Sequence, residues 1–144
     1  MTELVVMSFA YSRGEPPDAN LVFDMRFLRN PHWQEELRPL SGLDEAVGAY
    51  IAGDAAFEEA LARIEALLVT LLPLYRGDAK DVVRVAFGCT GGRHRSVHVA
   101  EHVAGRLRAA GLSPRLFHRD LAAPPRDGTE RSAGARQTVA KVTE

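Results

Sequence analysis

The chain has a single cysteine and no long apolar run, and each of these shortages excludes a class of protein. Its 144 residues include a single cysteine, Cys89, so no internal disulfide can form. No apolar stretch approaches the ~18–20 residues of a membrane-spanning helix, and the N-terminus lacks a signal-peptide pattern. We therefore expect a soluble cytoplasmic protein without membrane contact.

Several catalytic and nucleotide-binding signatures are missing as well. The chain contains neither the GxxxxGK-Ser/Thr phosphate loop nor a GxGxxG dinucleotide loop, and no Ser-His-Asp arrangement is recognisable. Nucleotide binding of those two kinds is therefore not predicted, and no cofactor is expected.

What is present is typical of one globular domain. Apolar residues make up 46% and charged residues 26% of the chain. Arginine supplies 16 of the 18 basic residues, and the charge is uneven: residues 1–83 carry a net −7 and residues 84–144 a net +6. This asymmetry suggests a polyanionic partner for the C-terminal half, but a fold that mixes the two halves would remove it.

Hydrophobic patterning predicts an α/β domain with a mostly parallel sheet, flanking helices and a ligand site at the C-terminal strand ends. Residues 1–121 form this domain, and residues 122–144, which lack periodicity, are expected to be a flexible tail. The expected strands cover residues 3–9, 21–28, 82–87 and 114–121. The expected helices cover residues 41–51, a segment that Asp54 caps and that Pro73 and Gly77 end, and 97 to about 110.

The most informative segment is the loop Gly88–Ser96, between a buried strand and a helix. Gly91 and Gly92 allow backbone N–H groups to converge, and the helix start adds a positive dipole end. Arginine, histidine, threonine and serine side chains surround the same turn. This composition predicts a pocket for a phosphate, a sulfate or a similar oxyanion.

Cys89 and Arg95 also have the Cys-x5-Arg-Ser spacing of cysteine-dependent phosphatases. In that alternative Cys89 would be the nucleophile, and the general acid would have to be Asp120 or Asp24. The histidine that usually precedes such a cysteine is replaced by Gly88. The other interpretation is that Cys89 packs behind an anion-binding loop, and we favour a protein that is not an enzyme.

Histidines suggest two further sites. His32 and Trp33 end the second predicted strand and could cover a sugar ring or a base, although a backbone-bonded histidine beside a core tryptophan is equally consistent. His94, His98 and His102 share one helix face, but no cysteine pair or HExxH order accompanies them. We therefore predict no metal.

Polar motifs along the chain resemble the C-terminal domain of the bacterial RNase adapter RapZ family, from Val6 to about Leu121. They lie in segments 8–9, 14–19, 21–33, 36–44, 88–97 and 118–120, with Glu101. In full-length members a P-loop kinase-like domain precedes this one. The resemblance implies sensing of a phosphorylated amino sugar, glucosamine-6-phosphate, and RNA binding that delivers a small RNA to an endoribonuclease. It also makes a homodimer plausible.

The residues implied for the sugar-phosphate pocket are His32, Thr90, Gly91, Gly92, His94, Arg95 and Ser96, with Asp24 and Arg26 nearby. Arg119 is the residue expected to contact RNA. Ser12 stands where the family commonly has lysine.

Overall fold

Two strands with buried C-terminal halves form the centre of the sheet in the computed structural model, which describes residues 3–76 and 82–122. All pairings are parallel, and the strand order is β2-β3-β1-β4. The elements are β1 (Glu3–Ala10), η1 (Tyr11–Arg13), β2 (Leu21–Asp24), η2 (Pro31–Trp33), α1 (Glu45–Ala52), α2 (Phe57–Arg76), β3 (Val82–Cys89), α3 (Arg95–Ala109) and β4 (Arg115–His118). The predicted α/β class and parallel sheet are confirmed.

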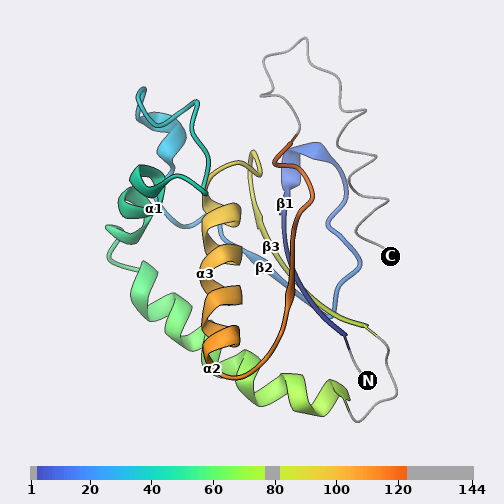
Figure 1. Ribbon diagram of the computed structural model, residues 1–144. Coiled ribbons are helices and arrows are strands. Elements are labelled where there is room, and N and C mark those ends of the chain that lie inside the picture. The colour runs from blue at the N-terminus through green and yellow to red at the C-terminus, as the bar shows by residue number, and fades with distance from the viewer. Residues whose placement is uncertain (1–2, 77–81, 123–144) are drawn as a thin grey trace.

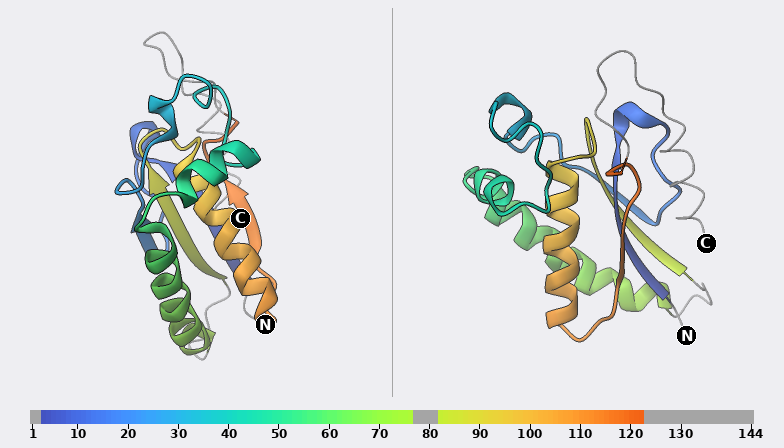
Figure 2. Two further views of the ribbon diagram at one scale, coloured as in Figure 1. Left: turned by 90° about the vertical axis from the view of Figure 1, so that its left-hand side faces the viewer. Right: turned by 45° about the horizontal axis from the view of Figure 1, so that its top comes forward.

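The helices lie on one side of the sheet, and segment 11–20 crosses the other (Figures 1 and 2). Right-handed crossovers require this division. The connections β2–β3 and β3–β4 step across the sheet in one direction, whereas β1–β2 steps back in the opposite direction. The chain therefore leaves the ends of the neighbouring strands β1 and β3 over opposite faces. This is the topological switch point, where open α/β sheets bind ligands.

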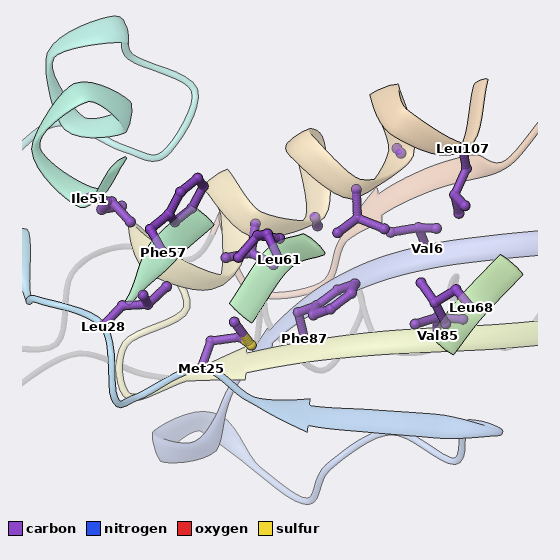
Figure 3. Packing of buried hydrophobic residues seen from close by; sticks show 14 of the residues in the cluster. Val6, Met25, Leu28, Ile51, Phe57, Leu61, Leu68, Val85, Phe87 and Leu107 are labelled. Atoms are coloured by element: carbon purple, nitrogen blue, oxygen red, sulfur yellow. The ribbon is translucent and has the colours of Figure 1, made fainter. Parts of the chain in front are cut away.

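The main core fills the space between the sheet and the helices. Val6, Val85 and Phe87 of the sheet face Leu68 of α2 and Leu107 of α3, and all five side chains are fully buried (Figure 3). A smaller cluster of Met7, Phe9 and Ala86 lies on the opposite face, where Tyr11 and Ala19 of the crossing segment pack against it. Both faces of β1 and β3 are covered, which holds their C-terminal ends rigidly.

Two predicted strands are shorter than expected. β2 ends at Asp24 instead of Leu28, because Met25 and Leu28 form a turn that inserts both side chains into the core. The apolar residues of the predicted strand 21–28 therefore indicate that the segment is buried, and not that all of it is a strand. β4 covers Arg115–His118 within the predicted 114–121, and the chain turns after it.

The helix boundaries also differ from prediction. α1 begins at Glu45 because Ser41 and Asp44 form a hydrogen-bonded turn before it. α2 begins at Phe57, and Asp54 accepts the Ala56 N–H at 2.9 Å in the preceding turn. Pro73 does not end α2 but lies inside it.

Burial explains why α2 continues past Pro73. A proline inside a helix costs ~3 kcal/mol. Leu68 and Leu72 before this position are buried in the core, and Tyr75 after it packs against the same core, so burial on both sides of Pro73 offsets the cost. The predicted ending at Gly77 and the predicted flexible tail 123–144 lie outside the described residues. No helix in the described ranges is long and apolar enough to cross a membrane.

Candidate functional site

A pocket of ≈ 690 Å³ lies at the C-terminal ends of β1 and β3. Four segments far apart in the sequence meet there, and a fifth, residues 38–39, closes one wall. The lining residues are Ser12, Arg13, Asn30, His32, Arg38, Pro39, Cys89, Thr90, Gly91, Arg93, His94, Arg95, Asp120 and Leu121. The expected convergence of the loops after β1, β2, β3 and β4 is therefore present in the structure.

The end of β1 and the η1 turn that follows it contact the loop after β3 beside this pocket. The Ser12 N–H donates to the Thr90 carbonyl at 3.1 Å. Gly92 has a φ of +69°, and a Cβ atom at this position would lie 2.6 Å from the Cβ atom of Ala10. The lack of a side chain at Gly92 therefore allows the loop to pack closely against Ala10. Gly91 lines the pocket, and a Cβ atom there would have nothing within 4 Å.

Arg95 is the buried cation of the site, with 5% of its surface exposed. Its Nη1 donates to the carbonyls of Arg26 and Leu28 at 2.7 and 3.1 Å, and its Nη2 lies 3.5 Å from Thr90 Oγ1. The guanidinium therefore holds the turn after β2 against the loop. It leaves other N–H groups and its charge to the pocket.

Two further arginines fasten the wall formed by residues 30–40. Arg93 donates from Nε to the Leu40 carbonyl at 2.9 Å and from Nη2 to the Pro39 carbonyl at 2.6 Å. Arg38 donates from Nε to the His32 carbonyl at 2.7 Å. Both residues line the pocket, so the same side chains hold the wall in place and add positive charge to it.

His94 presents an unpartnered ring nitrogen in this cationic setting. The residue is 6% exposed, and its Nε2 has no hydrogen-bond partner among the described residues. Burial is the main reason that the pKa of His94 is lowered from its ordinary value of 6.5, so the ring is neutral at pH 7. Backbone groups of Leu40, Arg38 and Leu37 act on the same ring and partly oppose the effect of burial on its pKa. The Nε2 atom itself is buried, so His94 contributes a packed ring to the pocket wall.

The other two histidines of the α3 set (His94, His98 and His102, hereafter the α3 histidines) lie away from the pocket. Both rings pack against Phe57, with centroids 5.6 Å and 5.3 Å away. Burial lowers the pKa of each. No group of three or more metal-ligating side chains is found in the described part of the chain.

Cys89 lies at the bottom of the pocket and is 2% exposed. Its Sγ lies 3.1 Å from Ser96 Oγ and accepts the Ser96 N–H at 3.3 Å. Ser96 is fully buried and does not line the pocket. These contacts fit a thiol that supports the start of α3.

Asp24 and Arg26 form an exposed ion pair outside the pocket lining, with Arg26 Nη2 2.7 Å from Asp24 Oδ2. Because β2 ends at Asp24, the two residues do not share a strand face as predicted. They meet through a turn in which the Arg26 N–H also donates to Asp24 Oδ1. The hydrogen bond from the Arg26 side chain is the main reason that the Asp24 pKa is lowered. The Arg26 guanidinium lies 4.0 Å from the Tyr11 ring centroid.

Arg119, the residue expected to contact RNA, is buried in this structure. It is 2% exposed, and its guanidinium donates to Asp120 Oδ2 and to the carbonyls of Glu15 and Ala10. Asp120 also accepts the Ala10 N–H at 2.7 Å. In this conformation Arg119 cannot reach an RNA phosphate; it anchors the β4 end to the segment after β1.

A hydrogen-bonded chain of three side chains beside β4 was not predicted from the sequence, although Glu101 and segment 118–120 belong to the polar motifs. Ser8 Oγ lies 2.7 Å from His118 Nδ1, and His118 Nε2 lies 2.8 Å from Glu101 Oε2. Ser8 is fully buried and does not line the pocket, so its hydroxyl is not an accessible nucleophile. Only the packing of α3 on β1 and β4 brings these three residues together.

Sequence reasoning missed most of the arginines of the pocket. Of the predicted site residues, His32, Cys89, Thr90, Gly91, His94 and Arg95 line it, whereas Gly92, Ser96, Asp24 and Arg26 do not. Arg13 and Arg93 lie in segments that were predicted to meet at the site but were not named as binding residues, and Arg38 was not predicted. Arg13 follows the first strand directly, and this position was the available signal. Trp33 is 74% exposed, which excludes the alternative of a core tryptophan.

Comparisons with known proteins agree on one family. The chain is 64% identical over 120 residues to a "Nucleotide-binding protein" of Rhizorhabdus wittichii, a match that covers 83% of this chain and 38% of that protein. It is 56% identical over 127 residues to one of Sphingopyxis alaskensis (88% and 40%) and 57% identical over 126 residues to one of Novosphingobium aromaticivorans (88% and 41%).

The chain thus spans about two fifths of the length of these curated relatives. The family model described as "RapZ C-terminal domain" matches residues 2–122, which include every residue of the pocket. The chain therefore belongs to the RapZ C-terminal domain family.

Proposed function

We propose that this domain binds a phosphorylated amino sugar of the glucosamine-6-phosphate type and acts as a regulatory sensor. The observation that carries the proposal is the pocket at the switch point, which is lined by four arginines and by the exposed Thr90–Gly91 turn. An anion is the ligand that arginine forks and loop amides favour.

In this proposal the phosphate lies at the loop after β3. Arg95 supplies charge and its remaining N–H groups, while Thr90 and Gly91 are exposed at the rim and offer a hydroxyl and backbone amides. His32 is exposed, and its hydrogen bonds within the described residues involve only its backbone atoms, so its ring is available to sugar hydroxyls. A sensor needs selective binding and no bond cleavage.

Phosphoryl transfer is the alternative that the geometry favours less. An attacking thiolate must reach phosphorus, but Cys89 is 2% exposed and its sulfur is engaged with Ser96. The Nη1 of Arg95 is also engaged with two carbonyls, so the fork that a phosphatase arginine offers to phosphate oxygens is only partly available.

A ligand panel tests the proposal. Thermal unfolding is measured with glucosamine-6-phosphate, glucose-6-phosphate and inorganic phosphate, and saturation at ~100 times Kd stabilises the fold by ~2.7 kcal/mol. His32→Ala should weaken binding of the sugar phosphate while leaving binding of inorganic phosphate unchanged. Absence of a shift with every phosphorylated sugar would contradict the proposal.

The RNA-adapter role implied by the family remains a prediction, and the burial of Arg119 does not support that residue as its contact. The relatives are named for nucleotide binding, but the two nucleotide loops sought in the sequence are absent from this chain. Binding of a structured RNA should weaken steeply as salt rises, because phosphate contacts release counterions. Binding that is absent or insensitive to salt would remove this role.

A further inference from the structure

The connection between β2 and α1 supplies one side of the pocket. Residues 26–44 (hereafter the strap), all of which the structure describes, form turns apart from the three-residue η2. The strap passes beside the N-terminal end of α3 (Figure 1). It contributes to the pocket lining the residues Asn30, His32, Arg38 and Pro39. The position of the strap therefore decides whether this part of the pocket is complete.

Two arginines at the start of α3 hold the strap near both of its ends. Arg95 donates to two carbonyls near the beginning of the strap, and Arg93 donates to two carbonyls near its end. The acceptors are the carbonyls of Arg26, Leu28, Pro39 and Leu40. Each guanidinium has five N–H donors, so both arginines retain donors for a ligand in the pocket that they line. The same two side chains thus connect the pocket to the strap.

A glycine of the strap lies directly on the first turn of α3. The Gly42 N–H donates to the Arg93 carbonyl at 2.8 Å. A Cβ atom at Gly42 would lie 2.4 Å from the carbonyl oxygen of His94 and 2.5 Å from the backbone nitrogen of His98. Any side chain at this position would push this part of the strap away from α3. Gly42 does not line the pocket, so a substitution there changes the strap without removing a pocket side chain.

Apolar side chains keep the strap on the domain at other points. Leu28 and Leu37 are buried in the main core. The strap also carries three of the exposed large apolar side chains of the described ranges, which are Phe27, Trp33 and Leu43. A ligand is therefore expected to tighten an attached strap and not to fold a free one.

We propose that the strap and the anion-binding loop are coupled, so that an anionic ligand held by Arg93 and Arg95 tightens the strap against α3. The two guanidinium groups bring like charges to one pocket, and a bound phosphate offsets their repulsion and fixes their orientation. Fixed guanidinium groups in turn hold the strap carbonyls. The ligand thus binds the tightened strap better than the loosened one, which is what a shift in population requires.

This inference rests on the proposed function and supplies its regulation. A sensor must differ on its surface between the free and the bound state, and the strap carries exposed side chains such as Trp33. Its attachment to the pocket through Arg93 and Arg95 is the route by which the ligand changes that surface.

Amide hydrogen exchange of the wild-type domain, followed by NMR with and without saturating glucosamine-6-phosphate, tests the coupling. The Gly42 amide, which donates to the Arg93 carbonyl, should exchange about tenfold more slowly in the bound protein, within the ~5–150-fold range typical of coupled sites. The amides of Arg108 and Ala109 are the internal reference, because the end of a helix exchanges by local fraying. Binding without slower exchange at Gly42 overturns the inference and leaves the sensor proposal standing.

The reverse effect follows from the reciprocity of coupled sites: a loosened strap should weaken the ligand. Gly42→Ala should reduce the affinity for glucosamine-6-phosphate about tenfold in isothermal titration. Gly105→Ala is the matched control, because a Cβ atom on this α3 glycine would have nothing within 4 Å, and it should bind as wild type does.

Equal affinities of Gly42→Ala and Gly105→Ala overturn the inference. If Gly42→Ala does not fold, the exchange rate of the wild-type Gly42 amide decides. If wild type does not bind glucosamine-6-phosphate, the proposed function and this inference fail together.

Discussion

Adjacent glycines in the loop after β3 should respond oppositely to the same small substitution. For Gly92→Ala, the left-handed φ of +69° costs ~1–2 kcal/mol for an L-residue. The new methyl would lie 2.6 Å from Ala10 Cβ and 3.1 Å from Ala10 N, and overpacking of this kind costs ~1–3 kcal/mol. Lower entropy of the unfolded chain returns ~0.4–1 kcal/mol. The net loss is about 1.5–4 kcal/mol.

Gly91→Ala adds the same methyl where nothing lies within 4 Å, and the structure records no positive φ there. We expect the free energy of unfolding to change by less than ~1 kcal/mol. Because Gly91 lines the pocket, the methyl would occupy space beside the bound anion. Affinity for a phosphorylated sugar should then fall about tenfold, the lower end of the cost of an overpacked contact.

Thermal and urea unfolding of both variants, with titration of glucosamine-6-phosphate, separate these effects. Gly92→Ala should lower Tm by roughly 5–15 °C, whereas Gly91→Ala should leave Tm near that of wild type. Equal Tm values for the two variants would refute the role assigned to the contact between the loop and β1. Normal ligand affinity in Gly91→Ala would refute the placement of the anion.

Three further predictions concern buried groups. Burial lowers the pKa of each of the α3 histidines below the ordinary 6.5. The unfolded chain therefore binds more protons than the folded chain below pH 6.5. The contribution of these histidines to stability is full above that pH and is lost as the pH falls toward their folded-state pKa values. Urea unfolding at pH 7.5 and 5.5 should show lower stability at pH 5.5, and equal stability would contradict this. Arg119→Ala leaves Asp120 buried without its partner and should cost ~3–5 kcal/mol in chemical denaturation; unchanged stability would return Arg119 to the candidates for RNA contact. Wild type should not hydrolyse an aryl phosphate, and turnover that disappears in Cys89→Ser would instead establish the phosphatase alternative.

Patterns within short segments predicted the location of the candidate site, because each of them depends only on residues that are neighbours in the sequence. Two glycines at a strand-to-helix turn mark an anion-binding loop, and strand ends in a parallel sheet share one edge. Thr90, Gly91, His94 and Arg95 could therefore be assigned to a site from the sequence, and they do line the pocket. The parallel sheet was predictable for the same reason.

The sequence alone determined the class of fold and identified the loop after β3 as part of the candidate site. The tertiary structure decided which side chains share the pocket: it buried Arg119, and it brought Arg13, Arg38 and Arg93 to the pocket lining. Such contacts depend on the path of the chain between distant segments, which periodicity does not encode. The physical reason is that an arginine has the same sequence signature whether it holds a carbonyl, pairs with a buried carboxylate or faces a ligand, and only packing distinguishes these fates.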